Sequence, residues 1–175
     1  MAEQTIIIHI KGYWRNQDKM DLPEQAGLFF VYEANYNPTD QTVDLLKLIY
    51  IGDADNIKSQ ILHREHESSW MDHVAAGHEL CFACAAIDNY YRGRARAAYV
   101  ITHQPPANNN SAEVFQFDTT TIVSNGNTAL INPVITARKN KAVADEILLS
   151  TNRKEMIPVR AVQVSTCNLN DRPFH

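Results

Sequence analysis

The residues with the clearest chemical potential are three arginines at alternate positions, Arg92, Arg94 and Arg96. The segment from Asn89 to Ala112 that contains them has neither Asp nor Glu. A guanidinium group binds phosphate through paired N–H donors, so this cluster indicates a site for an anionic ligand such as a nucleic-acid backbone. The same charges are also typical of a solvated helix start, and both interpretations stay open.

A second group of candidates lies where an apolar segment gives way to helical spacing. Tyr50 and Gly52 end the apolar segment, and Gln60 and Arg64 follow it four residues apart. Side chains at that spacing share a helix face, so we expect Gln60 and Arg64 to project together. Tyrosine, glutamine and arginine side chains all donate hydrogen bonds that a phosphate oxygen accepts, and only the arginine adds a positive charge.

The cysteines and histidines give a weaker signal for a metal. Cys81 and Cys84 have the spacing of a metal or redox pair, but residues 79–87 have the pattern of a buried strand. Side chains three apart on a strand point to opposite faces, so we predict two buried structural thiols. Four histidines are close in sequence without a second pair of ligands to complete a tetrahedral zinc site: His63, His66, His73 and His78. We therefore expect no resident metal.

The pattern of apolar residues predicts an α+β domain over residues 1–110, with a small antiparallel sheet flanked by helices. Its strands are expected at 5–11, 27–34, 45–51 and 78–87, and its helices at 57–67, 70–76 and 89–102. The strands at 27–34 and 45–51 should pair as an antiparallel hairpin, since a turn-rich segment joins them.

Residues 111–175 are expected to form a β-rich C-terminal extension packed on this domain. Its strands are expected at 113–118, 120–124, 129–137 and 159–166, with a helix at 138–149.

Two short motifs in the first domain, Gly27-Leu28-Phe29 and Tyr50-Ile51-Gly52, precede a helix that ends in Pro105-Pro106-Ala107-Asn108. This order resembles the GIY-YIG nuclease superfamily over residues 27–108. The resemblance implies a small antiparallel sheet flanked by helices and cleavage of DNA with one divalent metal. It also implies that two motif tyrosines and a helical arginine surround the scissile phosphate, while a later glutamate holds the metal.

Three positions depart from the family pattern. Phe29 stands at the first-motif tyrosine, Gln60 at the arginine and Arg96 at the metal-binding glutamate. A guanidinium at that last position repels a divalent cation. The resemblance therefore implies a catalytically degenerate protein without a cofactor, which binds nucleic acid or another phosphate-bearing ligand through Arg92, Arg94, Arg96 and Asn108.

Two other functions and one structural interpretation remain open. An active, divergent endonuclease would use Mg²⁺, Tyr50, Arg64 and a carboxylate from elsewhere; the carboxylates considered are Glu33, Asp53, Glu65 and Glu67. A protein-interaction module would use the extension, or Trp14 and Trp70, as its contact surface. Arg96 would instead be structural if it formed an ion pair, for example with Glu33 or Glu65.

Composition limits the class of protein. The chain has 175 residues, of which 45% are hydrophobic, and a formal net charge of -4. That charge argues against a surface covered with basic residues for nucleic acid. Its longest apolar runs are shorter than the roughly 20 residues needed to span a bilayer. We expect a cytoplasmic protein without membrane contact, and the sequence leaves its oligomeric state open.

Overall fold

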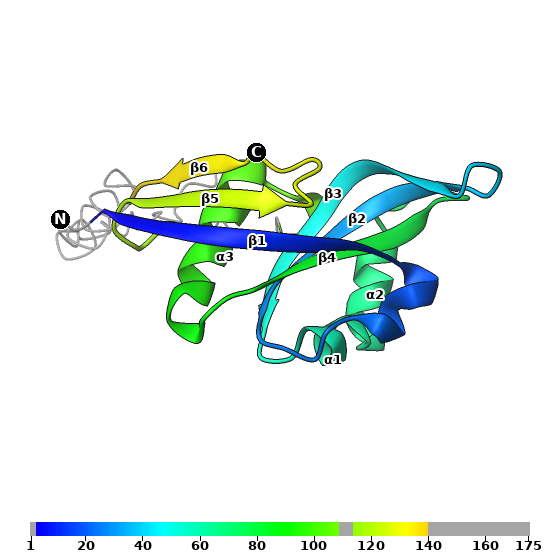
Figure 1. Ribbon diagram of the computed structural model, residues 1–175, viewed down its shortest axis with the longest axis horizontal. Coiled ribbons are helices and arrows are strands. Elements are labelled where there is room, and N and C mark those ends of the chain that lie inside the picture. Colours follow the sequence, from blue (N-terminus) through cyan, green and yellow to red (C-terminus); the bar gives the residue numbers. More distant parts are fainter. Residues whose placement is uncertain (1–2, 109–113, 140–175) are drawn as a thin grey trace, which may run out of the picture. The chain divides into compact units, whose positions relative to one another are not determined.

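One curled, mixed sheet of six strands organises the residues that the structure describes, 3–108 and 114–139 (Figure 1). The structure is a computed structural model. The strands lie in the order β3-β2-β4-β1-β5-β6. They are β1 (Gln4–Arg15), β2 (Gly27–Asn37), β3 (Thr42–Ala54), β4 (Glu79–Ala86), β5 (Thr120–Gly126) and β6 (Val134–Ala137). The predicted α+β class is confirmed.

The helices are short apart from one. They are α1 (Ile57–Ile61), α2 (Arg64–Met71) and α3 (Asn89–His103), with 3₁₀ turns η1 (Asn16–Asp21) and η2 (Pro106–Asn108). Asn56 caps α1 by accepting a hydrogen bond from the Ser59 N–H, and Asp88 caps α3 by accepting one from the Tyr90 N–H. Among the described residues, no helix is long and apolar enough to cross a membrane.

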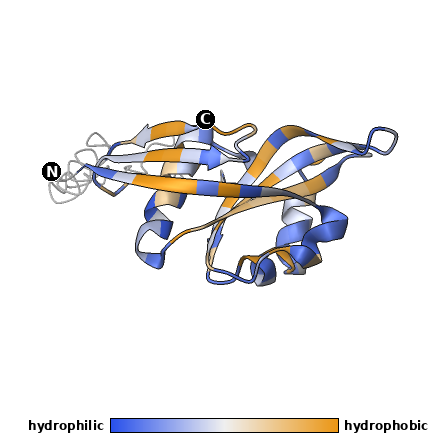
Figure 2. Cartoon of the chain, in the orientation of Figure 1, coloured by the Kyte–Doolittle hydropathy of each residue, from blue (hydrophilic) through white to orange (hydrophobic). Residues whose placement is uncertain are grey.

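The sheet has a helix-covered core on each face. Phe29 and Phe30 are adjacent in β2 and belong to different buried clusters, because neighbouring side chains of a strand point to opposite faces. The cluster of Phe30 includes Ala95, Ala98 and Tyr99 of α3. The cluster of Phe29 instead includes residues of α1 and α2. β2 and β4 are buried almost continuously, as packing on both faces requires. Figure 2 shows hydrophobic residues along the strands, with polar residues between them in places.

The predicted hairpin is confirmed, because β2 and β3 pair antiparallel from Gly27 opposite Ala54 to Asn37 opposite Thr42. The strands of residues 1–110 pair antiparallel, as expected, and the one parallel pair joins β1 to β5 of the expected extension. Residues 4–10 of β1 pair in parallel with residues 120–126 of β5, whereas residues 11–15 pair antiparallel with β4. Alternating isoleucines predict the strand but contain no information about the direction of its neighbour.

Two predicted helix boundaries are wrong. Residues 57–67 form two helices, because His63 takes an extended conformation (φ -71°, ψ 116°) between α1 and α2. The short helix expected at 70–76 is the end of α2, which stops at Met71. The expected helix at 89–102 is confirmed as α3.

The described part of the expected extension adds two strands to the sheet. β5 confirms the strand expected at 120–124, and β6 confirms only the end of the strand expected at 129–137. The two strands pair antiparallel. Residues 114–118 form no strand, contrary to prediction. The strand expected at 159–166 and most of the helix expected at 138–149 lie outside the described residues.

Candidate functional site

The motif residues of the two paired strands meet at an aromatic cluster on the face covered by α1 and α2. The Phe29 ring lies 5.8 Å from the Tyr50 ring and 6.0 Å from the Trp70 ring, centroid to centroid. Tyr50 and Trp70 are 5.5 Å apart. Phe29 and Trp70 are buried and Tyr50 is half-buried. Phe29 is therefore a buried packing residue of this cluster and contributes no hydroxyl group.

Gly52 is required by the close packing of this cluster. It lies opposite Phe29 in the β2–β3 pairing. A Cβ at position 52 would overlap the Phe29 ring and lie 2.7 Å from Cε1 of Tyr50. The glycine thus allows both aromatic rings to lie over the end of β3.

Gln60 joins the cluster through a histidine. Its Nε2 lies 3.0 Å from Nε2 of His66, and the His66 ring stacks on Trp70 at a centroid distance of 6.0 Å and an interplanar angle of 20°. His63 lies beside His66, with 5.4 Å between ring centroids. The two histidines are exposed and Gln60 is half-buried. Arg64 begins α2, and its side chain is outside what the structure describes.

Two of the three arginines of α3, Arg92 and Arg96, contact the end of β3 and the loop after it. Arg92 donates from Nη1 to the Ala54 carbonyl at 2.8 Å and from Nη2 to Asp55 at 2.6 Å. Its Nε also lies 3.4 Å from Oδ2 of Asp53. Arg92 is only 8% exposed, so its guanidinium is committed to the protein rather than presented to a ligand.

Arg96 also pairs with Asp53, with 3.5 Å between Nε and Oδ1. Arg96 therefore forms the ion pair considered from the sequence, but its partner is Asp53 rather than Glu33 or Glu65. One carboxylate thus lies between two guanidinium groups. Asp53 and Asp55 offset the positive charge that the sequence alone indicates for this region.

Arg94 points to a different part of the molecule. Its guanidinium carbon lies 5.3 Å from the centre of the Phe117 ring, which is a cation–π arrangement. The structure therefore separates Arg94 from the Asp53 pairings of Arg92 and Arg96.

Asn108 bonds to the outer edge of β3. Its Oδ1 accepts from the Ile51 N–H at 2.8 Å, and its Nδ2 donates to the Ile51 carbonyl at 2.9 Å. The side chain is buried. Asn108 thus pairs with Ile51 as a neighbouring strand would, so its role in the structure is to complete this edge of the sheet.

The thiols and carboxylates do not assemble into a metal centre in the described part of the chain, where no group of three His, Cys, Asp or Glu residues converges. Cys81 and Cys84 are buried, as predicted, and belong to the two opposite core clusters. Burial raises the pKa of Cys81 to about 12 and that of Cys84 to about 11. Both thiols are therefore protonated at neutral pH and unreactive.

Several contacts were not anticipated from the sequence. The sequence does not predict Asp55 as the partner of Arg92 or His66 as the partner of Gln60. The polar residues directly after the Tyr50-Ile51-Gly52 motif were the available signal for the first pairing. No sequence pattern identified the second, since α1 and α2 meet at an angle that the sequence does not specify.

Comparisons of this chain with protein-family models, characterised proteins and solved structures find no match.

Proposed function

We propose that this chain is a catalytically degenerate GIY-YIG-like protein, which binds nucleic acid or another phosphate-bearing ligand at the Tyr50 cluster without cutting it. The observation that carries the absence of cleavage is the pairing of Asp53 with both Arg92 and Arg96. The resemblance puts a metal-binding glutamate at position 96. Here that position holds a cation that neutralises the neighbouring carboxylate.

The arrangement of elements supports the proposal. Residues 27–108 run through two paired strands, two short helices, a third strand and a long helix, in that order. Four of the positions that the resemblance names lie near one another on β2, β3 and α1, whereas Arg96 lies on α3, the helix that packs on the other face of the sheet. Phe29, Tyr50 and Gly52 are in contact, and Gln60 reaches the same cluster through His66.

Four carboxylates could in principle replace the missing metal ligand: Glu33, Asp53, Glu65 and Glu67. Three of them would have to give up bonds that they already make. Asp53 is paired with two arginines. Glu33 accepts hydrogen bonds from His78 and from the Ala75 N–H, and Glu67 is paired with Lys19. Glu65, in the first turn of α2, is the fourth. Removing a carboxylate from such pairs costs free energy that an active site would have to recover from metal binding.

The mode of binding follows from the polar groups at the aromatic cluster. Gln60 and His66 supply polar groups and Tyr50 and Trp70 supply aromatic surface, while the charge of Arg92 is already used within the fold. A nucleic-acid strand held in this way relies more on stacking and hydrogen bonds than on ion pairs. We therefore expect affinity to fall with salt along a shallow slope, since few counterions are released.

The first experiment is cleavage of supercoiled plasmid and of single-stranded DNA with Mg²⁺ or Mn²⁺, using EDTA as a control. We expect no cleavage at high protein concentration. Metal-dependent nicking that Tyr50→Phe abolishes would contradict the proposal and support the divergent endonuclease, because the tyrosine hydroxyl would then be needed for the reaction.

The second experiment measures binding of fluorescein-labelled single-stranded DNA, RNA and duplex DNA at low salt. We expect Gln60→Ala combined with His66→Ala to weaken binding by about tenfold, the loss of one or two hydrogen bonds and a stacking surface. The matched control is Gln116→Ala, an exposed glutamine before β5. Absence of binding by the unaltered protein, or equal loss in the control, would refute the proposed role of this cluster.

A further inference from the structure

The sheet opens between β1 and β4. Their antiparallel pairing covers Lys11–Arg15 and Cys81–Cys84, with Lys11 opposite Cys84 as its last pair. β4 continues to Ala86, and β1 extends back to Gln4, without pairing to each other. Beyond this point β1 is paired on one side only, with β5.

The direction of the backbone groups identifies what this open edge presents. The Gln4 N–H donates to Thr119, and the Ile10 carbonyl accepts from Asn127, so the even-numbered residues of β1 direct their backbone groups toward β5. Backbone groups alternate along a strand, so Thr5, Ile7 and His9 direct theirs toward the opening. Within the described ranges no strand pairs with them there. The Thr5 carbonyl is reached instead by Nε2 of the neighbouring Gln4 side chain, at 3.3 Å.

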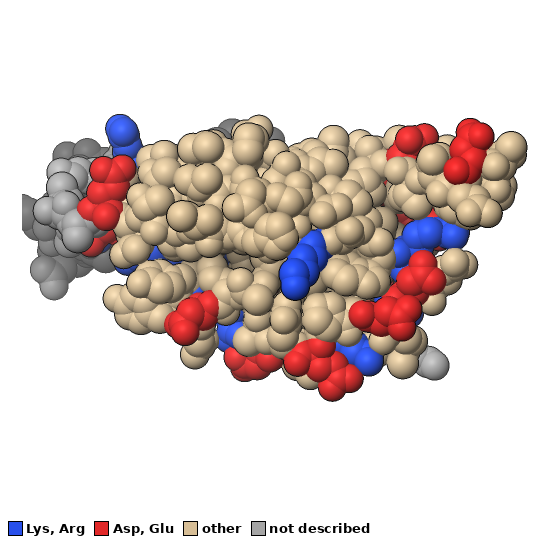
Figure 3. Space-filling model, in the orientation of Figure 1, with Lys and Arg blue, Asp and Glu red and all other residues tan. Residues whose placement is uncertain are grey.

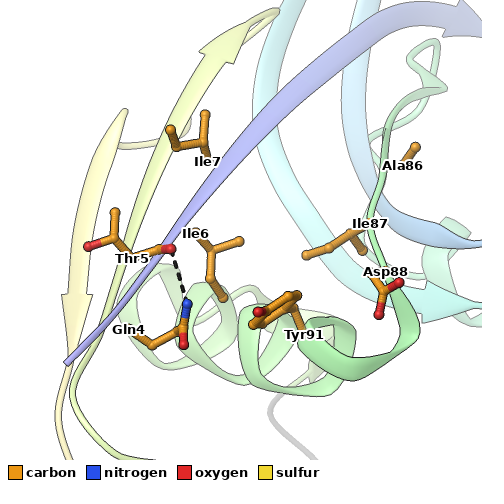
Figure 4. Close-up of a pocket in the computed structure, with 8 residues that line it drawn as sticks. All are labelled: Gln4, Thr5, Ile6, Ile7, Ala86, Ile87, Asp88 and Tyr91. Atoms are coloured by element: carbon orange, nitrogen blue, oxygen red, sulfur yellow. Dashed lines mark hydrogen bonds between the residues drawn. The ribbon is translucent and has the colours of Figure 1, made fainter. Parts of the chain in front are cut away.

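A pocket of about 300 Å³ occupies the opening (Figure 4). It is bordered by β1 on one side and by the end of β4 and the start of α3 on the other. Its lining is mixed: Ile6, Ile87 and Tyr91 supply apolar surface, and Gln4 and Asp88 supply polar groups. This combination accepts an apolar side chain next to a polar backbone and favours a cationic group near Asp88.

The other face of the same edge is apolar, and its side chains are exposed in the part of the chain that the structure describes. Ile7, Val123 and Val134 lie directly opposite one another across β1, β5 and β6. Ile7 is 74% exposed and Val134 is 59% exposed. Figure 3 shows few charged side chains over these three strands. A strand placed beside Ile7 would therefore find apolar neighbours above the sheet as well as in the pocket below it.

We propose that the open edge of β1 at Thr5, Ile7 and His9 binds an extended peptide of a partner protein as an added strand. The peptide pairs with the exposed backbone groups and alternates its side chains between the pocket and the outer face. An apolar residue enters the pocket, and a lysine or arginine of the peptide faces Asp88. This site is separate from the Tyr50 cluster and does not depend on the function proposed there.

The test uses the full chain and a fluorescein-labelled octapeptide in which valine alternates with threonine and one terminal residue is lysine. We expect saturable binding by fluorescence anisotropy. The control peptide has the same sequence with alternate backbone nitrogens methylated, which blocks pairing with a strand edge. Equal binding of both peptides, or no binding of the first at millimolar concentration, would overturn the proposal.

Two substitutions of Ile7 separate the contribution of its backbone N–H to peptide binding from that of its side chain. Ile7→Pro removes an N–H that the β1–β5 pairing does not use, and Ile7→Thr keeps that N–H. We expect Ile7→Pro to weaken peptide binding by about tenfold relative to Ile7→Thr, with both variants folded by circular dichroism. Equal affinities of the two variants would overturn the assignment of the edge.

Sedimentation measurements test whether a second copy of this chain, rather than a partner peptide, occupies the edge of β1. If the protein forms a dimer that Ile7→Pro abolishes and Ile7→Thr preserves, the edge is used by a second copy, and the assignment to a partner peptide is wrong. We expect the sedimentation behaviour of the two variants to be the same.

Discussion

Arg92 shows how a residue suited to bind phosphate becomes part of the fold. Its guanidinium bonds to the Ala54 carbonyl and to Asp55 and lies within ion-pair distance of Asp53. A planar group with five donors on three nitrogens can satisfy a carbonyl and two carboxylates at once, whereas the three donors of a lysine all lie on one nitrogen. Its position at the start of α3 fixes that helix to the end of β3.

The Arg92 contacts predict a graded loss of stability. We expect Arg92→Ala to lower the free energy of unfolding by about 2 kcal/mol, since it leaves the Ala54 carbonyl without its donor. Arg92→Lys should lower the free energy of unfolding by part of that amount. Arg94→Ala removes a cation–π contact and should lower it by about 0.5 kcal/mol. Urea unfolding of the three variants measures the differences, and equal effects at positions 92 and 94 would contradict the assigned roles.

Asn108 supports a second prediction, because both of its polar atoms bond to Ile51. Asn108→Ala leaves a backbone N–H and a carbonyl unpaired and should cost about 2–3 kcal/mol. Asn108→Asp should be no more stable than the alanine variant, because a carboxylate oxygen would face the Ile51 carbonyl. Thermal unfolding measures this, with the exposed Asn132→Ala as control. Full stability of Asn108→Asp would show that the Nδ2 hydrogen bond is unimportant.

At the scale of elements, Glu33 fastens β2 to the segment between α2 and β4. Its Oε1 accepts from Nδ1 of His78 at 2.6 Å and from the Ala75 N–H at 3.0 Å. The hydrogen bond from His78, followed by that from Ala75, lowers the pKa of Glu33 below its usual value of 4.5. The ionised carboxylate is therefore more stable in the folded chain than in the unfolded one.

The lowered pKa determines the direction of the pH effect. The stabilisation from Glu33 is complete above the unfolded value of 4.5 and is lost as pH falls through the lower folded pKa. We expect Glu33→Gln to lower the thermal midpoint at neutral pH and to make its decline toward about pH 3 less steep. Glu65→Gln, at an exposed position of α2, is the control. An unchanged acid dependence in Glu33→Gln would contradict this account.

At the scale of the whole molecule, β1 joins two parts of the sheet by changing partners along its length. Residues 4–10 of β1 pair with β5, and residues 11–15 pair with β4. Among the described residues, each half of β1 is thus paired with a strand on one side only. This arrangement leaves the opening and its pocket between β1 and β4 (Figure 4).

Hydrogen exchange should show this partial pairing directly. We expect slow exchange for the amides of Ile6, Ile8 and Ile10, whose N–H groups face β5, and fast exchange for those of Ile7 and His9. Lys11 should be protected as well, since it pairs with Cys84. Uniform protection along β1, measured by NMR without any peptide present, would mean that the edge is already covered.

The sequence by itself determined the α+β class, the β2–β3 hairpin, α3 and the burial of Cys81 and Cys84. These features depend on local periodicity and turn residues, which a single sequence displays directly. It also identified Phe29, Tyr50, Gly52 and Gln60, which the folded chain brings to one cluster.

Only the tertiary structure decided how the charged and polar groups are used. The pairing of Arg96 with Asp53, the bonding of Asn108 to Ile51 and the parallel neighbour of β1 each join residues that are far apart in the sequence. Such contacts depend on the register and direction of packed elements, which local spacing does not encode. A guanidinium and an amide that look available in the sequence are therefore bonded within the fold, while the open edge of β1 exists only because two strands diverge.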